Sequence, residues 1–402
     1  MEIRKITPEE RIHYSAICSQ VFLDIPRRDI RAELQNPPES KLENNKKSPA
    51  WAVFENGKML SGMTVHDYTW RMHGHETRMG GIGAVVTLPE ARGKGLVRHL
   101  FKPVFDEMLA SEQVYSFLFP FHYGYYRHFG YEICLTNRMA EVAISEFARF
   151  PYPKNIQPHE PTDSHVPFAE IYATFAKNRN FSVVRSADNW KQMLDRDPFQ
   201  RHQFTYLNRD ELGNPDAYIL YKTDFVAGGS TMDINELCYT SPAGLFAIFG
   251  FIGKMSAEYS KIRWRVPTDL NMQALLPNPY NVKWENKSSG MNRIVNVLTA
   301  LNQQPAPQQN GTAVLYIHDD FRPDNSGAYR LSWENGALQT TRTNNDELTS
   351  DMAMHVTTLA QLTSGYIKPS EARYRADVTV RGDISLLDAL FPKKDIYLYE
   401  GF

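Results

Sequence analysis

Apolar and polar positions alternate along the chain in patterns that predict a mixture of strands and helices. Apolar runs at residues 51–55 and 59–66 predict two strands, and Asn56-Gly57 between them is a strong hairpin signal. A third strand is expected at 68–73. Before them, apolar residues at three- and four-residue spacing predict a helix over 9–23. The chain therefore opens with a helix followed by antiparallel strands.

The stretch from 78 to 109 predicts a strand, a tight polar loop and a helix. The strand is the apolar run 82–88, and the loop is Arg92-Gly93-Lys94-Gly95-Leu96. Pro103 lies inside the predicted helix and is expected to kink it. The helix shows the spacing of a buried stripe at Val97, Leu100, Phe101, Val104, Phe105 and Met108.

The polar loop has the properties of a phosphate site. Its glycines allow a tight turn, its two cations flank the first helical amides, and free N–H groups at a helix N-terminus attract anions. A P-loop needs Ser or Thr after Gly-Lys, and a dinucleotide fingerprint needs a third glycine where this chain has Val86. The alternative interpretation is an ordinary basic turn.

The same order of elements starts again after a polar, proline-rich link that ends near Pro167. A helix at 168–176 precedes strands at 203–208, 217–223 and 234–239. The place of the phosphate loop holds Ser241-Pro242-Ala243-Gly244, before a helix at 245–255. With no cation and one glycine, this second copy is not expected to bind a phosphate ligand.

The last part of the chain predicts a small α+β module. It contains a strand at 313–318, a hairpin at Glu334-Asn335-Gly336, and helices at 351–364 and 385–391. The expected fold class is therefore α+β with mixed sheets. The expected domains are 1–150, 151–288 and 289–402.

Length and composition limit the classes of protein. A chain of 402 residues, 42% hydrophobic and 22% charged, is in the globular range. A net charge of −2 argues against a general nucleic-acid or anionic-membrane binder. Cys18, Cys134 and Cys238 are far apart and predict neither disulfides nor a zinc site, so no metal is expected. The longest apolar run, 244–253, is too short to span a bilayer, and a soluble cytoplasmic protein is expected.

The loop 92–96 resembles the Gln/Arg-x-x-Gly-x-Gly/Ala signature of the GNAT superfamily of N-acetyltransferases, with Val97 in the usual place of a small residue. Along its full length the chain is similar to the enhanced intracellular survival (Eis) acetyltransferases. The most specific parts are this loop, the segment Tyr126-Arg127-His128-Phe129-Gly130-Tyr131 and the terminal Phe402. The resemblance implies tandem GNAT domains, a sterol-carrier-like third domain and a hexamer.

The resemblance also implies an acetyl-CoA site. Carried over residue by residue, its contacts are Val85, Val86, Thr87, Arg92, Gly93, Lys94, Gly95 and Leu96. Thr87 stands where an apolar β-branched residue is usual. Gly93 stands where a second arginine is common, and Lys94 is expected to compensate for the lost charge.

The expected chemistry is direct acetyl transfer to an amine in a ternary complex, with backbone N–H groups polarising the thioester carbonyl. By resemblance, Tyr126 is the acid and the terminal carboxylate of Phe402 is the base. His122 and His128 are competing acid–base candidates, because histidine titrates near neutrality. Core packing remains the alternative for Tyr126, and a strand that closes the last module remains the alternative for the chain end.

Family substrates are amines of the aminoglycoside, polyamine or lysine type, and Asp24 and Glu400 stand where acidic substrate contacts are expected. Either could equally be a solvated surface acid. Two rival functions remain: a lipid or apolar-ligand carrier with a vestigial front half, and a peptidoglycan-type aminoacyl transferase. Retention of Arg92, Gly93 and Gly95 argues against a vestigial front half.

Overall fold

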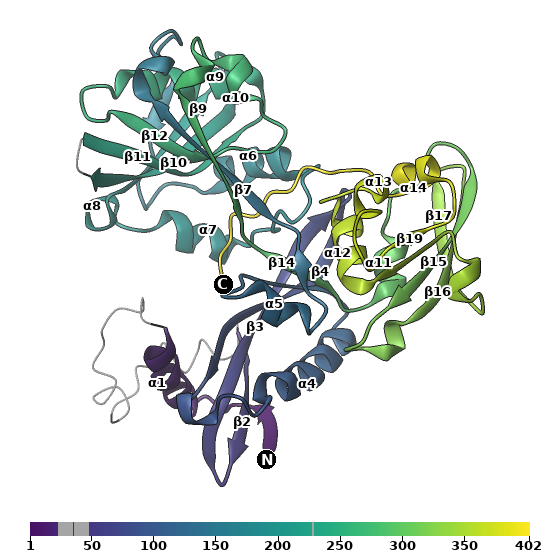
Figure 1. Cartoon of the computed structure of the whole chain (residues 1–402). Coiled ribbons are helices and arrows are strands. Elements are labelled where there is room, and N and C mark those ends of the chain that lie inside the picture. Colours follow the sequence, from purple (N-terminus) through teal and green to yellow (C-terminus); the bar gives the residue numbers. More distant parts are fainter. Residues whose placement is uncertain (23–34, 36–47, 227–228) are drawn as a thin grey trace.

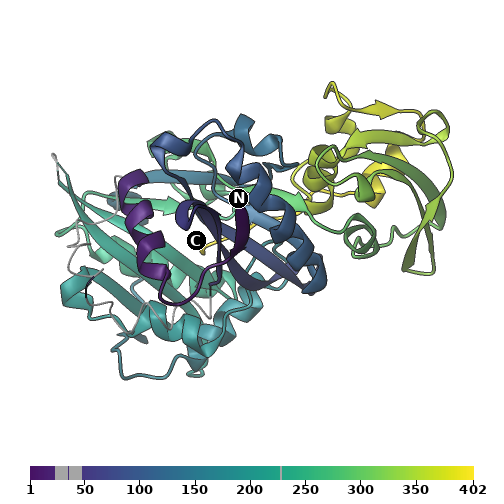
Figure 2. The same ribbon diagram turned by 90° about the horizontal axis from the view of Figure 1, so that it is seen from below.

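The computed structural model describes residues 1–22, 35, 48–226 and 229–402. These residues form three units, each built on one mixed β-sheet (Figure 1). We call them the first, second and third unit in chain order. Figure 2 shows the first two units side by side, the third at one end, and the C-terminus between the first two.

The first unit holds a seven-stranded sheet in which β4 and β5 are parallel and the other pairs are antiparallel. Its strands, in spatial order, are β1 (Glu2–Lys5), β2 (Ala50–Glu55), β3 (Lys58–Met72), β4 (His75–Thr87), β5 (Gln113–Leu118), β14 (Met291–Ile294) and β6 (Glu132–Ile133). Its helices are α1 (Arg11–Val21), η1 (Pro89–Ala91), α4 (Leu96–Ala110) and α5 (Tyr123–Arg127).

The second unit repeats this plan. Its strands, in spatial order, are β13 (Val282–Ser288), β7 (Thr136–Ala143), β12 (Lys261–Arg265), β11 (Gly229–Tyr239), β10 (Pro215–Val226), β9 (Gln203–Arg209) and β8 (Ile156–Pro158). Its helices are η2 (Ile144–Phe147), α6 (Val166–Ala176), α7 (Ala187–Leu194), α8 (Pro198–Arg201), α9 (Pro242–Lys254), α10 (Met272–Leu275) and η3 (Pro279–Asn281).

The third unit has a five-stranded sheet with helices packed on it. Its strands, in spatial order, are β17 (Ala337–Thr343), β16 (Gly327–Glu334), β15 (Gly311–His318), β18 (Met352–His355) and β19 (Thr379–Val380). Its helices are α11 (Val297–Asn302), η4 (Pro323–Asn325), η5 (Glu347–Thr349), α12 (Val356–Ser364), α13 (Pro369–Ala372) and α14 (Ile384–Leu390).

The first two units exchange strands. β14 lies between β5 and β6 in the first sheet, and β7 lies between β13 and β12 in the second. The two crossings are adjacent, because Cys134 and Leu135 donate their amides to the carbonyl of Gly290. A Cβ on Gly290 would lie 2.1 Å from the Phe117 ring, so the crossing requires a glycine. The strands β7 and β14 thus each pair with strands of another predicted domain. The domain ranges 1–150, 151–288 and 289–402 remain predictions.

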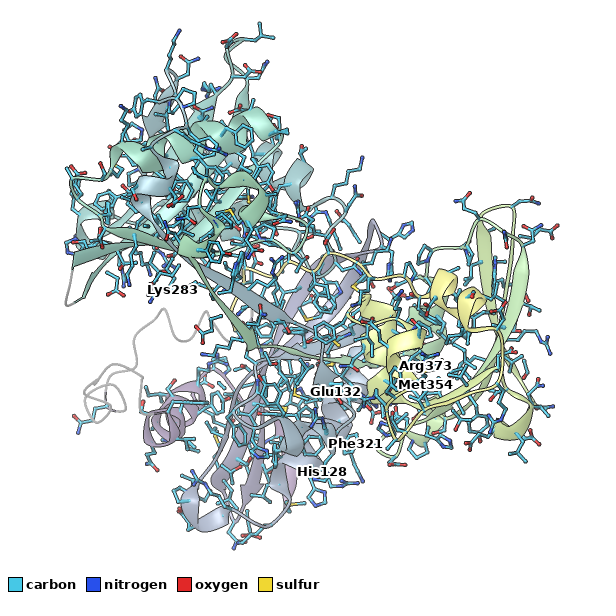
Figure 3. The ribbon with its side chains drawn as sticks, turned by 45° about the horizontal axis from the view of Figure 1, so that its top comes forward. His128, Glu132, Lys283, Phe321, Met354 and Arg373 are labelled. Carbon is cyan, nitrogen blue, oxygen red and sulfur yellow. The ribbon has the colours of Figure 1, made fainter. Side chains whose placement is uncertain are left out.

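The third unit shares a hydrophobic core with the first. All nine residues of α12 are buried, and this helix contacts β14 and β6 as well as β15 and β18. Phe321 of the third unit packs edge-on against Phe105 and Phe129. Glu132 pairs with Arg375 across the same boundary at 3.2 Å. Figure 3 labels Phe321 and Glu132 where the two units meet.

Most predicted elements are present, and some differ in their bounds. The strands expected at 59–66 and 68–73 are one strand, β3, which turns at His73-Gly74 into β4. The helix expected at 351–364 begins only at Val356, because 352–355 form β18. Pro103 lies inside α4, which is one helix from Leu96 to Ala110, and the kink expected there remains a prediction.

Candidate functional site

The central strand β4 carries a β-bulge where it separates from β5. Its register with β3 shifts between Gly62 and Thr64, opposite Ala84, which has a positive φ of 47°. The hydroxyl of Tyr14 on α1 donates to the carbonyl of Ala84. Pairing of β4 with β5 ends at Ile82 and Leu118, so the last residues of β4 diverge from the neighbouring strand.

A cavity of about 660 Å³ opens beside these last residues of β4. It is lined by Val21, Phe22, Val85, Val86, Thr87, Ala91, Arg92, Gly93, Gly95, Leu96, Val97, Phe121 and Tyr125. Of the predicted cofactor contacts, the structure brings all but Lys94 to the lining; Lys94 is exposed on the same loop. The hydroxyl of Thr87 is 2.9 Å from that of Ser61, which accounts for a polar residue in a largely apolar strand.

The loop before α4 leaves the helix N-terminus open to a ligand. Gly93 and Gly95 have φ of 79° and 70°, values that glycine adopts without strain, and no described atom lies within 4 Å of a Cβ built on either. Gly95 is the N-cap, and no side chain caps the helix. The first amides of α4 are therefore available to an anion beside Arg92.

Tyr126 lies on α5, directly behind the cavity wall. Its side chain is 2% exposed and packs against Phe121, Tyr125, Phe129 and Tyr131. Burial raises the pKa of Tyr126 above its ordinary value, so the phenol stays protonated at neutral pH.

Tyr125 is a second phenol at this site, and sequence analysis missed it. It is half-buried, its ring lines the cavity, and burial also raises its pKa. The only signal in the sequence was its place in a run of tyrosines. The competing histidines are both exposed, and Nδ1 of His122 caps α5 by accepting the amide of Tyr125 at 3.2 Å. His128 is the C-cap of the same helix.

The chain end lies against β4. A Cβ on Gly81 would lie 2.8 Å from the Phe402 ring, and a Cβ on Gly83 would lie 3.1 Å from its carboxyl carbon. The ring also contacts Tyr68 and Phe119, at centroid distances of 5.3 and 5.4 Å. Two glycines of β4 thus make room for the last residue, which brings a carboxylate next to the bulge.

Of the two acidic residues expected to contact the substrate, Glu400 lies within the described residues. Asp24 lies outside the described residues. Glu400 is 14% exposed at its side chain, and its Oε1 accepts from Arg185 at 2.7 Å. Its Oε2 is buried and has no hydrogen-bond partner among the described residues. No pattern in the sequence pointed to Arg185.

Three domain families match the chain. An "Acetyltransferase (GNAT) domain" family matches residues 2–134, a second family of that description matches 182–294, and a "Sterol carrier protein domain" family matches 297–399. The two acetyltransferase matches together span more than half of the chain. No protein of curated function matches the sequence.

Solved structures share the whole architecture. A GCN5-related N-acetyltransferase from Anabaena variabilis is 20% identical with a TM-score of 0.84, and the match covers 100% of both chains. A probable N-acyltransferase from Enterococcus faecalis is 21% identical with a TM-score of 0.83, covering 100% of this chain and 99% of the other. Eis1 from Mycobacterium abscessus is 17% identical with a TM-score of 0.79, covering 100% of both.

Within the described residues, no helix combines the length and the apolar character needed to cross a membrane. The two acetyltransferase matches, the sterol carrier match and the shared architecture agree with one another. The chain therefore belongs to the GNAT superfamily of N-acetyltransferases and has the Eis-like order of two acetyltransferase domains followed by a sterol carrier domain.

Proposed function

We propose that the first unit transfers the acetyl group of acetyl-CoA directly to an amine in a ternary complex. The observation that carries the proposal is the uncapped N-terminus of α4 at the mouth of a cavity that ends on the bulged strand β4. Phosphates bind such a helix end, and the bulge leaves backbone groups unpaired next to the cavity.

Acetyl-CoA would be bound by charged side chains and by backbone groups, from the loop before α4 and from β4. Arg92, Lys94 and the amides after Gly93 and Gly95 would hold the pyrophosphate. Val85, Val86, Thr87 and Leu96 would line the path of the pantetheine arm. The backbone N–H groups beyond the bulge would polarise the thioester carbonyl.

Direct transfer is favoured because the cysteines are poor nucleophiles. Cys18, Cys134 and Cys238 are all buried. Burial raises the pKa of Cys18 to about 11 and that of Cys134 to about 12, and it raises the pKa of Cys238 well above the ordinary value of a thiol. Since the thiolate is the nucleophile, an acetyl-cysteine intermediate is disfavoured at neutral pH.

Tyr126 is the proposed acid and the terminal carboxylate of Phe402 the proposed base. Tyr126 is protonated at neutral pH and packs against Phe121 and Tyr125 of the cavity lining, from where it would donate to the departing thiolate. The carboxylate of Phe402, next to Gly83, would orient the amine and accept its proton through a water. The test compares an N-terminally tagged enzyme with one that ends at Gly401 and one that carries extra residues after Phe402. Both altered ends should lose most turnover and keep acetyl-CoA affinity.

The proposed acceptor is an amine of the aminoglycoside, polyamine or lysine type. The carboxylate of the chain end lies next to Gly83 of β4, and a carboxylate attracts an ammonium group by charge. The proposal also includes a cytoplasmic location and a homo-oligomer, hexameric by resemblance, which light scattering would measure.

A lipid carrier is the weaker candidate. The apolar residues of the third unit, including Leu315 and Leu359, pack in one cluster with Trp70 and Phe117 of the first unit. The helix α12 is buried between the two units. The apolar side chains of the third unit therefore serve its attachment to the enzyme.

The deciding experiment measures acetyl-CoA binding by calorimetry and then thiol release with a panel of amines. The proposal expects binding and amine-dependent release of CoA. Absence of acetyl-CoA binding would end the enzyme interpretation, and binding without release for any amine would exclude amines as acceptors.

A further inference from the structure

The last residues of the chain run between the first and second units. The amide of Asn180 donates to the carbonyl of Asp395 at 2.8 Å, and the amide of Tyr397 donates to the carbonyl of Asn180 at 2.9 Å. Arg265 on β12 donates to the carbonyl of Leu398 at 2.6 Å. Hydrogen bonds to the second unit thus fix the path of the tail as far as Leu398.

Beyond Leu398, a buried ion pair holds the tail in place. The side chain of Arg185 is 2% exposed, and its Nε donates to Glu400 at 2.7 Å. Its two terminal nitrogens donate to Glu236 on β11 at 2.9 and 2.7 Å. Tyr218 and Tyr397 also donate to Glu236, at 2.7 and 2.8 Å. Arg185 is therefore shared between the interior of the second unit and a residue two positions from the chain end.

Aromatic rings hold the guanidinium in place. Its carbon lies 3.8 Å from the centroid of the Tyr172 ring, 4.8 Å from Trp190 and 5.1 Å from Tyr399. Burial lowers the pKa of Arg185, but the charges of Glu236 and Glu400 outweigh it and raise the pKa well above the ordinary value. A planar, permanently charged group that binds two carboxylates and stacks on rings cannot be replaced by lysine without loss.

The segment that carries Arg185 is itself attached to the first unit. Phe181 and Val184 donate their amides to Arg71 and Thr69 of β3, each at 2.8 Å, and Ser182 accepts the amide of Arg71 at 2.8 Å. The segment therefore lies along the same strand that neighbours β4. Arg185 follows directly, so its position is fixed relative to the bulge.

We propose that Arg185 is a positioning residue, which holds the chain end through Glu400 so that the carboxylate of Phe402 stays beside Gly83. This inference rests on the proposed role of Phe402. The inference also gives the second unit a structural role, because Glu236 of that unit binds the arginine that positions the chain end beside the first unit. In this inference Glu400 binds Arg185 and does not bind the amine substrate.

The experiment uses three variants of the full chain. Glu400→Gln removes the negative charge at position 400 and leaves the pair between Arg185 and Glu236 intact. Arg185→Lys keeps a cation and loses the forked geometry. Arg263→Met is the control, because it removes an ion pair of the second unit, from Arg263 on β12 to Asp233 on β11 at 2.7 Å, that lies away from the tail.

Two readouts are combined. One is steady-state kinetics, in which a misplaced reacting group is expected to lower kcat by about 10- to 100-fold while the KM for the amine changes by less than about twofold. The other is the rate at which carboxypeptidase Y releases Phe402, which should rise by about tenfold or more because the tail is no longer tied down. The Arg263→Met variant should behave like the native chain in both.

Unchanged release in Glu400→Gln and Arg185→Lys would overturn the inference. A raised KM for the amine with unchanged kcat would also overturn it, since Glu400 would then be a substrate contact. Faster release with unchanged kcat, in a protein whose Gly401-ending form is inactive, would overturn this inference alone. The same result with an active Gly401-ending form would overturn the proposed role of Phe402 as well.

Discussion

The two acetyltransferase units begin their central helices in opposite ways. In the first, Gly95 precedes α4 and no side chain occupies the helix amides. In the second, the hydroxyl of Ser241 accepts the amide of Gly244 at 3.1 Å, and Pro242 has no amide to offer. A Cβ on Gly244 would also lie 2.8 Å from the carbonyl of Asp216. A phosphate site thus depends on an uncapped, unobstructed helix end, and one fold can carry it or lack it.

The bulged strands differ in the same sense. β11 shifts register against β10 between Leu220 and Tyr221, and its pairing with β12 ends at Ile234, as that of β4 with β5 ends at Ile82. After the bulge of β4, Val85 lines a cavity. After the shift in β11, Glu236 is 1% exposed and bound to Arg185. Where the first unit has a cavity after its bulge, the second unit has a buried ion pair.

Removing the proposed proton donor of the first unit should have the largest effect. Tyr126→Phe is expected to lower kcat by about 10²- to 10⁴-fold, the range of general acid catalysis, with little change in the KM for acetyl-CoA. Tyr125→Phe is the matched variant on the same helix and should retain most activity. Loss of activity in Tyr125→Phe alone would transfer the role to Tyr125.

Displacing the chain end should have the next largest effect. In Gly81→Ala the new methyl group meets the Phe402 ring, so turnover should fall by about 10- to 100-fold while acetyl-CoA affinity is kept. Adding Phe402→Ala restores the space and keeps the carboxylate, and it should recover part of the loss. Full activity of the single variant would separate the chain end from the chemistry. Gly213→Ala in the second unit serves as control.

The hairpin β3–β4 should make the first unit sensitive to acid. Burial lowers the pKa of His66 and of His73 to about 4, whereas β10, the counterpart of β3, has no histidine. Both are neutral when folded and protonate when unfolded, so their stabilising contribution is full above about pH 6.5 and is lost as the pH falls toward 4. His73→Gln should reduce the loss of unfolding free energy between pH 7 and 5 by about 2 kcal/mol. Denaturant titration at both pH values measures this, and an unchanged difference would contradict it.

Uncapping the second unit should have the smallest effect. Ser241→Ala is expected to lower the free energy of unfolding by about 1 kcal/mol, the usual cost of a lost N-cap. The dissociation constant for acetyl-CoA should not change, as judged by calorimetry. Any change in that constant would indicate that the helix α9 takes part in binding.

Local signals in the sequence were sufficient for much of the fold. Asn56-Gly57 and Asn335-Gly336 both adopt the positive φ values that their hairpins need. The loop 92–96 was predicted because its glycines and its place between a strand and a helix are readable in one short segment. The exchange of β7 and β14 was not predicted, because pairing between strands about 150 residues apart leaves no local pattern.

The site was predictable only in part for the same reason. The cavity lining beside Arg92 follows from contiguous residues. The contacts that join distant segments, such as Phe402 on Gly81 and Arg185 on Glu400, arise only from the tertiary fold. The structure shows that Gly81 makes room for the aromatic ring of Phe402, which the residues around Gly81 do not indicate.

The central claim is that the first unit alone binds acetyl-CoA, and calorimetry tests it most directly. Arg92→Ala with Gly95→Glu places a carboxylate at the open helix end. Gly213→Glu is the matched control, because its φ of 87° imposes the same backbone strain in an open turn of the second unit, whereas Gly244 is obstructed. We predict one acetyl-CoA per chain for the native protein and for Gly213→Glu, and none for the double variant at a thermal stability similar to that of Gly213→Glu. Binding by the double variant, or a second acetyl-CoA in the native chain, would contradict the account.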